Sequence, residues 1–202
     1  MSMTLEELGA LASTCTLCRL AAGRTQVVFG VGSPSADVMF IGEGPGYHED
    51  KQGEPFVGAA GQLLTRLLGE VGLRREDVYI ANVVKCRPPG NRDPLPDEID
   101  SCRPYLVGQL ELVRPRVVVT LGNFATRMIL ERQVSISRVR GQRFELDGRT
   151  VVPTFHPAAI LRGGGEASAQ MAAIRSDFAA VRAILAEPPP VPAAVEEQLG
   201  LF

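Results

Sequence analysis

The chain has 202 residues, of which 45% are hydrophobic and 22% charged, and its formal net charge is −2. This composition is that of an ordinary globular domain and excludes a chain that is disordered along most of its length. The near-neutral charge also excludes a uniformly basic nucleic-acid-binding protein. Residues 111–143, however, hold seven arginines against two glutamates. This basic stretch predicts either a strip along a phosphate backbone or an ordinary solvated surface.

The ends of the chain and its hydropathy bear on location. No run of about 18 apolar residues occurs, so no membrane-spanning helix is predicted. Residues 1–7 are acidic and lack the apolar stretch of a signal peptide. We therefore expect a cytoplasmic, monomeric protein that makes no contact with a membrane.

The first half of the chain alternates short apolar runs with segments of helical spacing. Residues 37–41 form an apolar run that ends at Gly42, which predicts a buried strand leading into a tight turn. Residues 61–71 carry leucines at helical spacing and predict a helix. A second strand is predicted at 78–81. Residues 96–113 predict a helix, because a proline and two acidic residues stand in its first turn.

The second half continues this alternation. Residues 117–121 predict a third strand, and the next helix is expected to begin near Asn123. Residues 144–152 surround an Asp-Gly pair and predict a hairpin with a primed turn. Residues 167–186 predict the closing helix. Strands alternating with helices favour a parallel-rich α/β sandwich over residues 1–186.

Residues 187–202 differ in kind from the rest of the chain. The stretch 188–192 is rich in proline, which cannot continue a helix, and it predicts a semi-rigid spacer. The spacer leads to a polar segment that ends in apolar residues with no evident core to join.

Four cysteines occur, at Cys15, Cys18, Cys86 and Cys102. Thiols stay reduced in the cytoplasm, so two disulfides are not expected. Cys15 and Cys18 are separated by two residues and can hold one metal centre, but the other two do not form the second pair of a zinc ribbon. Four thiolates from three chain segments favour an iron–sulfur cubane. A zinc site and unrelated buried cysteines are the alternatives.

The turn after the first predicted strand has three glycines within residues 42–46, which allow a ligand close to the main chain. The lysine and hydroxyl of a phosphate-binding loop are missing, as is the dinucleotide spacing. Glu43, Glu49 and Asp50 would also repel phosphate. The turn therefore predicts a site for a neutral or cationic group, or for a transition state that develops positive charge.

Three further residues are candidates for the same site. Phe56 lies on a loop, where an aromatic ring can stack on a flat ligand or anchor the loop to the core. Asn82 follows the second strand, and its amide matches an imide edge such as that of uracil, or caps a turn. His156 follows a strand and precedes a proline. In open α/β sheets ligands bind at this carboxyl edge, although a lone histidine is more often structural.

Together these motifs resemble the family 4 uracil–DNA glycosylases, bacterial and archaeal enzymes with a 4Fe–4S cluster. The resemblance covers residues from about 4 to 186, with every motif in order. It implies a single-domain, three-layer α/β/α sandwich with a short central, mostly parallel sheet. The four cysteines match the ligands of a structural cluster. The matching motifs are residues 42–46 with 49–50, residues 55–58, residues 82–89 and residues 156–158.

The resemblance implies that the chain flips uracil out of DNA and hydrolyses its N-glycosidic bond, leaving an abasic site. Phe56 would stack on uracil, Asn82 would read the imide edge, and His156 would donate to O2 of the leaving anion. The backbone of the turn at Glu43 and Gly44 would complete the pocket.

Three acidic or aromatic residues have less defined roles. Glu43 and Glu49 would favour the oxocarbenium-like sugar or help to place water. Tyr47 would lie at the pocket wall, where the methyl group of thymine must be excluded. Family 1 enzymes position water with an aspartate where this chain has Gly44, so the sequence leaves the water-positioning group open.

The resemblance also implies contacts with DNA. Residues 158–162 would form the loop that wedges into the duplex, with Ile160 or Leu161 filling the gap left by the flipped base. Arg162 would hold a phosphate. The cluster would order DNA-contacting loops near Lys85, Arg87 and Arg92.

The end of the tail resembles the short peptide by which bacterial polymerases and repair enzymes dock on the sliding clamp. A glutamine and apolar anchors on an extended peptide suit a hydrophobic groove, and the alternative is a chance match. The residues concerned are Gln198, Leu199, Leu201 and Phe202.

Two other functions compete with the glycosylase. An iron–sulfur electron carrier or redox protein would explain the cysteines, and a non-catalytic DNA-binding module would explain the basic stretch. Both leave Phe56, Asn82 and His156 without a task.

Overall fold

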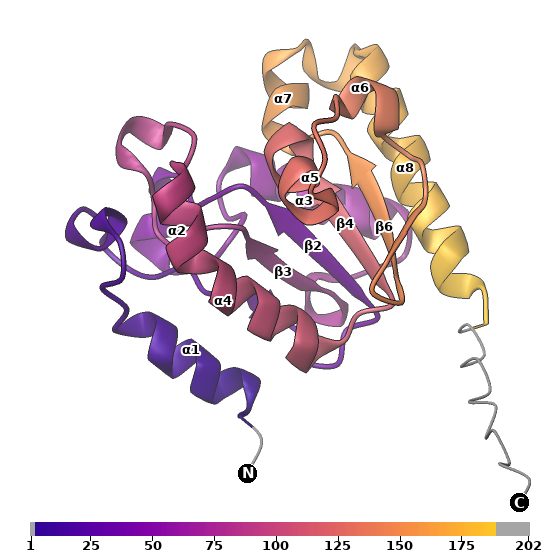
Figure 1. The fold of residues 1–202 in the computed structure, drawn as a ribbon. Coiled ribbons are helices and arrows are strands. Elements are labelled where there is room, and N and C mark those ends of the chain that lie inside the picture. The colour runs from indigo at the N-terminus through magenta and orange to yellow at the C-terminus, as the bar shows by residue number, and fades with distance from the viewer. Residues whose placement is uncertain (1–2, 189–202) are drawn as a thin grey trace, which may run out of the picture.

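The centre of the molecule is a six-stranded sheet (Figure 1). The computed structural model describes residues 3–188. The four central strands are parallel, and the two edge strands are antiparallel to their neighbours. In sheet order the strands are β1 (Val31–Gly32), β3 (Tyr79–Asn82), β2 (Val38–Gly42), β4 (Val117–Leu121), β6 (Arg149–Thr154) and β5 (Phe144–Leu146).

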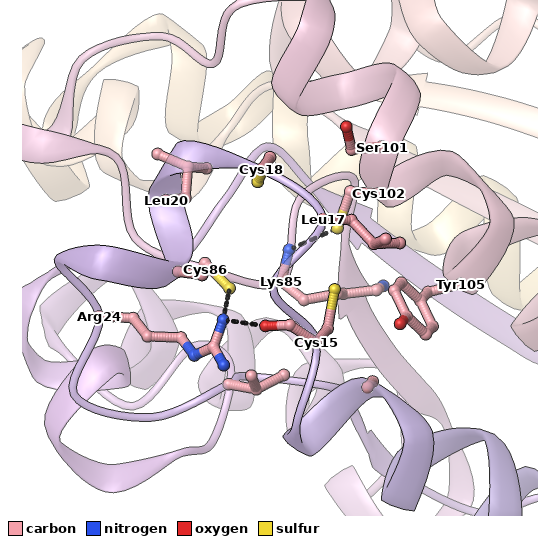
Figure 2. Close-up of a pocket in the computed structure, with 13 residues that line it drawn as sticks. Cys15, Leu17, Cys18, Leu20, Arg24, Lys85, Cys86, Ser101, Cys102 and Tyr105 are labelled. Carbon is pink, nitrogen blue, oxygen red and sulfur yellow. Dashed lines mark hydrogen bonds between the residues drawn. The ribbon is translucent and has the colours of Figure 1, made fainter.

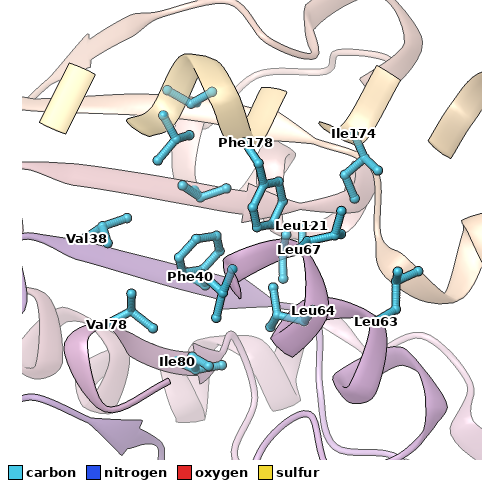
Figure 3. Packing of buried hydrophobic residues seen from close by; sticks show 14 of the residues in the cluster. Val38, Phe40, Leu63, Leu64, Leu67, Val78, Ile80, Leu121, Ile174 and Phe178 are labelled. Carbon is cyan, nitrogen blue, oxygen red and sulfur yellow. The ribbon is translucent and has the colours of Figure 1, made fainter. Parts of the chain in front are cut away.

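One face of the sheet is covered by α3 (Ala59–Glu70) and α8 (Ala169–Ala186). Phe40 of β2 and Phe178 of α8 stack there with their ring centroids 5.5 Å apart (Figure 3). Leu64 of α3 packs into the same cluster. This layer explains the leucine spacing in residues 61–71, since those side chains all point toward the sheet.

The other face is covered by α4 (Pro96–Val113) and α5 (Gly122–Leu130), which pack on Met39 and Ile41 of β2. Because helices cover both faces, every residue of β2 is buried, and the strand reads as a continuous apolar run. The fold is therefore the three-layer α/β/α sandwich that the sequence predicts.

The N-terminal helix α1 (Leu5–Ser13) lies along α4 (Figure 1). It begins with a capping box, in which the Glu7 amide donates to the Thr4 hydroxyl and the Thr4 amide donates to the Glu7 carboxylate. The remaining helical turns are η1 (Arg19–Ala22), α2 (Tyr47–Gln52), η2 (Arg75–Asp77), η3 (Pro89–Asn91), α6 (Ile136–Val139), α7 (Pro157–Arg162) and η4 (Gly165–Ala167).

The predicted strands and long helices are confirmed to within two residues. The hairpin turn is a primed one, since Asp147 and Gly148 have φ of 50° and 72°. The expectation of a loop at residues 158–162 is wrong, because that segment belongs to the helix α7. No helix in the described part of the chain is long and apolar enough to cross a membrane.

The parallel arrangement brings the ends of the central strands to one edge of the sheet. Gly42 at the end of β2 pairs with Asn82 at the end of β3. Leu121 at the end of β4 likewise pairs with Thr154 at the end of β6. The loops that follow these four strands therefore meet at a single edge, where open α/β sheets bind their ligands.

Candidate functional site

A cleft of about 510 Å³ opens at this carboxyl edge. Residues that follow each of the four parallel strands line it, so the strand order explains its position. The cleft brings together most of the residues that the sequence predicts for the site. Those residues are Glu43, Gly44, Glu49, Phe56, Asn82, Arg92, His156 and Arg162.

An aromatic stack forms one wall of the cleft. The rings of Phe56 and His156 are 5.5 Å apart and inclined by 29°. Phe56 is only 6% exposed and adopts a φ of 55°, a strained conformation for a non-glycine residue. The backbone of Gly61 holds it there, since a Cβ on Gly61 would lie 1.7 Å from the Phe56 carbonyl oxygen. The phenylalanine is thus both a core contact and a surface of the cleft.

The amide of Asn82 lies beside this stack. A Cβ placed on Gly42 would come within 2.4 Å of Asn82 Oδ1 and 2.6 Å of Phe56 Cζ, so only glycine leaves room for both side chains. Asn82 Oδ1 is buried and has no hydrogen-bond partner among residues 3–188. Buried polar atoms are normally paired, so this acceptor is suited to receive a hydrogen bond from a ligand.

His156 caps the N-terminus of α7 and is held in one orientation. Its Nδ1 accepts a hydrogen bond of 3.1 Å from the Ala158 amide, which places the ring proton on Nε2. The pKa of His156 is lowered to about 4, chiefly by burial and in part by the positive charge of Arg162, while Glu49 acts in the opposite sense. The imidazole is therefore neutral at pH 7 and can donate from Nε2.

The carboxylates of the glycine-rich turn are not equivalent. Burial raises the pKa of Glu43 to about 7, with a further contribution from the neighbouring carboxylate of Asp93. Glu49 Oε1 accepts hydrogen bonds of 3.0 Å from the amides of residues 57 and 58, which leaves its other oxygen free. Asp50 instead accepts from the Thr25 amide, so its role is to anchor the chain.

The four cysteines lie around a single small pocket (Figure 2). The guanidinium of Arg24 donates to the Cys15 carbonyl at 2.6 Å and to Cys86 Sγ at 3.5 Å. The Lys85 amide donates to Cys102 Sγ at 3.2 Å. Hydrogen bonds of this kind to sulfur stabilise thiolates. Within the described residues, no three His, Cys, Asp or Glu side chains are grouped closely enough to hold a single metal ion.

Three of the predicted contacts with DNA need correction. Lys85 is 1% exposed, with its ammonium turned into the core, so it does not reach a phosphate. Ile160 is fully buried on the inner face of α7 and cannot enter a duplex, whereas Leu161 is 43% exposed. Arg92 lines the cleft, but its guanidinium donates to both carboxylate oxygens of Glu98, at 2.9 and 2.6 Å. Arg92 is thus largely committed to anchoring the start of α4.

Tyr47 and Arg87 lie together outside the cleft. The ring of Tyr47 is half exposed at the start of α2, and the guanidinium of Arg87 lies 5.2 Å from its centroid. Tyr47 is the only predicted uracil contact that the structure places outside the cleft lining.

The opposite wall of the cleft was not predicted. It comes from α5, which begins directly after β4 and contributes Asn123, Phe124 and Arg127. Asn123 Oδ1 accepts from the Ile136 amide and so fixes α6 against α5. The signal available in the sequence was the position of Asn123 just after a predicted strand, which is the criterion that identified Asn82. Asp93, the neighbour of Glu43, carries no such signal.

The fold and this edge of the sheet define an α/β protein whose cleft combines an aromatic stack with a buried amide oxygen that has no partner among the described residues. A family model described as the uracil DNA glycosylase superfamily matches residues 29–179, three quarters of the chain. The protein belongs to that superfamily.

Curated relatives agree with this assignment. A Type-4 uracil-DNA glycosylase of Archaeoglobus fulgidus is 51% identical over 156 residues, which cover 73% of this chain and 78% of that protein. A Type-4 uracil-DNA glycosylase of Thermotoga maritima is 53% identical over 150 residues, with the same two coverages. A Type-5 uracil-DNA glycosylase of Pyrobaculum aerophilum is less similar, at 34% identity over 146 residues and 64% of each chain.

Proposed function

We propose that this protein removes uracil from DNA by hydrolysing its N-glycosidic bond, and that it acts in DNA repair in the cytoplasm. The buried, unpartnered Oδ1 of Asn82 carries the proposal. An amide presents an acceptor and a donor side by side, which matches N3–H and O4 of uracil. Cytosine has a ring nitrogen without hydrogen and an amino group in these positions, so an amide oriented with Oδ1 toward N3 would not pair with it.

His156 supports the chemical step. The glycosidic bond breaks with negative charge developing on uracil, and a donor aimed at O2 stabilises that charge. The Ala158 amide holds the neutral tautomer, so Nε2–H of His156 is available as that donor. Because the imidazole is uncharged before the reaction, it does not attract a carboxylate or a phosphate. It stabilises negative charge only as that charge develops on uracil.

The carboxylates of Glu43 and Glu49 act on the sugar. As uracil leaves, C1′ gains positive charge, which Glu43 and Glu49 stabilise from the glycine-rich turn. Glu49 is held by two backbone amides through Oε1, and its free oxygen can orient the attacking water. Glu43 takes part in its ionised form. Base flipping would be assisted by Leu161, exposed on α7, and Arg162 would hold a neighbouring phosphate.

The cysteine pocket fits the iron–sulfur cluster expected from the sequence. Four thiols line it, and the Arg24 and Lys85 N–H groups donate to two of the sulfurs. A cubane is wider than one ion, which suits sulfurs that converge without forming a single-ion site. When bound, the group would supply structural cross-linking among the segment between α1 and η1, the loop after β3 and α4. Since no three of these side chains form a single-ion site among the described residues, the pocket favours a cluster over zinc.

One experiment tests the proposed function. A labelled duplex with one U·G pair is incubated with the protein and then treated with alkali, beside a T·G duplex. We expect cleavage at uracil only, and a rate at least ~100-fold lower for Asn82→Ala, as for loss of a preorganised polar contact. Absence of cleavage by wild-type protein that retains its iron–sulfur chromophore would contradict the proposal and favour the redox or DNA-binding alternatives.

A further inference from the structure

Lys85 is a buried cation that the proposed chemistry does not use. Its side chain is fully enclosed and has no carboxylate partner among the described residues. Its Nζ donates instead to the Asn82 carbonyl oxygen at 2.7 Å and to Gln109 Oε1 at 2.5 Å. Burying an ammonium group costs free energy unless hydrogen-bond acceptors satisfy its N–H donors. Here the acceptors are two neutral oxygens and no carboxylate, so the burial of this charge needs an explanation.

Gln109 is itself held on both sides. Its Nε2 donates to the Phe29 carbonyl at 2.8 Å and to the Tyr79 hydroxyl at 3.1 Å. These two acceptors fix the orientation of the amide, so Oε1 must face Lys85. Lys85 is thus the donor to both Asn82 and Gln109, and Gln109 donates on to Tyr79, so the donors and acceptors of this buried network have a single assignment, which restricts its side chains.

The end of this network is the peptide group of the residue that faces the base. Asn82 is the last residue of β3, and the amide that follows it, that of Val83, donates to the Gly42 carbonyl at 2.9 Å. Lys85 holds the carbonyl oxygen of the same peptide group. The peptide plane after Asn82 is therefore fixed at both of its polar ends, and with it the direction in which the side-chain amide leaves the backbone.

The other end of Lys85 touches the cysteine pocket. The Lys85 amide donates to Cys102 Sγ, and Cys86 is the next residue in the chain (Figure 2). Cys102 and Gln109 are both buried on α4, seven residues apart, and so lie on the same face of the helix. A shift of α4 against the loop after β3 would therefore disturb the sulfur contact and the Lys85–Gln109 contact together.

We propose that Lys85 and Gln109 are positioning residues that tie the uracil-reading amide of Asn82 to the cysteine pocket, so that base recognition depends on α4 being correctly seated. The inference rests on the proposed function. It gives Lys85 a task in the core in place of the phosphate contact expected from the sequence.

The test is Lys85→Met in the full-length, cluster-containing protein. Methionine keeps the length of the stem and removes the donor to Asn82. We expect single-turnover excision of uracil to fall by about 10- to 100-fold, the usual effect of losing a group that orients a functional side chain. Binding of free uracil should weaken by a similar factor. Affinity for an undamaged duplex and the iron–sulfur absorbance should stay within about twofold. Lys51→Met is the matched control, because the chain has only these two lysines and Lys51 is exposed.

A second variant separates positioning from stability. Gln109→Leu removes the donor to the Phe29 carbonyl and the Tyr79 hydroxyl as well as the acceptor for Lys85, so it should lower the melting temperature at least as much as Lys85→Met. It leaves the Lys85 donor to the Asn82 carbonyl in place. If the proposal holds, excision and uracil binding, measured where both variants are folded, fall further in Lys85→Met than in Gln109→Leu. A loss of function that follows the melting temperature, or Lys85→Met within twofold of wild type in both readouts, would overturn it. A wild-type protein that neither excises nor binds uracil would instead refute the proposed function.

Discussion

At the scale of single residues, the site leaves no room for a side chain at Gly42. A Cβ at this position would overlap Asn82 Oδ1 and Phe56 Cζ. Gly42→Ala should therefore displace one or both side chains and lower excision by about 100-fold or more, as small misplacements in an active site do. Single-turnover kinetics on the U·G duplex would measure this change.

Gly69→Ala is the control for this substitution. Gly69 lies in α3, and a Cβ there meets nothing within 4 Å. This variant should keep full activity and gain about 0.5–1 kcal/mol in stability, because alanine is the better helix former. Equal activity of the Gly42→Ala and Gly69→Ala proteins would show that the close approach at Gly42 does not matter for the site.

Glu43 predicts the pH dependence of the reaction. Its pKa is raised from 4.5 to about 7, so near neutral pH the folded protein gains the carboxylate as the pH rises. If the ionised form stabilises the sugar cation, excision should increase with pH through about 7. This rising limb should disappear in Glu43→Gln, which cannot ionise. A pH–rate profile under single-turnover conditions checks both expectations, and an unchanged limb in the variant would assign it to another group.

The same shift has a consequence for stability. Between pH 4.5 and 7 the folded state binds the Glu43 proton more tightly than the unfolded state, so this group makes stability fall as pH rises. His156 acts in the opposite sense between pH 4 and 6.5, because its pKa is lowered on folding. The melting temperature of Glu43→Gln should therefore rise more steeply with pH over this range than that of wild type. Parallel curves would show that burial does not perturb Glu43.

At the scale of elements, α7 carries the duplex contact that can be tested separately from chemistry. Leu161 is exposed on this helix and Ile160 is buried beneath it. Leu161→Ala should slow excision from duplex DNA by about tenfold, because unstacking a base costs a few kcal/mol and the leucine would offset part of that cost. Excision from single-stranded DNA, which has no partner strand to replace, should stay within twofold.

Leu11→Ala supplies the comparison for this element, since Leu11 is exposed on α1, away from the cleft. It should leave both substrates unaffected. An equal loss on duplex and single strands in Leu161→Ala would mean that the side chain supports the fold of α7 and does not assist flipping.

The strands and long helices were predictable because their signals are local. β2 and β4 are covered on both faces, so every residue of each strand is buried and each strand is a continuous apolar run in the sequence. α1 was missed because it is short and buries only Leu8 and Ala12, too few positions to show a helical spacing. β1 has two residues, too few for any alternation to appear.

The site was predictable where position along a strand decides it. Asn82 and His156 follow strands, and parallel strands end at one edge, so topology alone brings them together. Lys85 could not be placed in this way. It stands three residues beyond Asn82, where the chain has left the sheet, and the direction of its side chain depends on Gln109, a distant residue of α4. Contacts across the fold, such as Asp93 beside Glu43, leave no local pattern in the sequence.

At the scale of the whole molecule, the basic stretch at residues 111–143 does not form one surface strip. Arg140 pairs with the buried Asp177, and Arg143 pairs with Glu187. Arg116 donates to the Glu187 carbonyl, while Arg127 alone of these four lines the cleft. Three of the seven arginines therefore fasten α8 and the end of the domain to the sheet. The phosphate contacts proposed for the protein come from around the cleft, and a continuous basic face is not needed for them.

The last prediction concerns the sliding-clamp peptide, residues 198–202, which lies outside the described residues. α8 ends at Ala186, and the carboxylate of Glu187 pairs with Arg143. The proline-rich spacer therefore starts from a fixed point on the domain, well after the last cleft residue in the chain. A tethered peptide raises the local concentration of the enzyme at a clamp without altering the active site. Deleting 198–202 should therefore abolish binding to a bacterial sliding clamp and leave excision from short duplexes unchanged.

Exchanging Glu196 and Glu197 for glutamine is the matched change outside the peptide, and it should preserve clamp binding. Surface plasmon resonance against immobilised clamp measures both, and binding that survives the deletion would assign clamp contact, if any, to the folded domain.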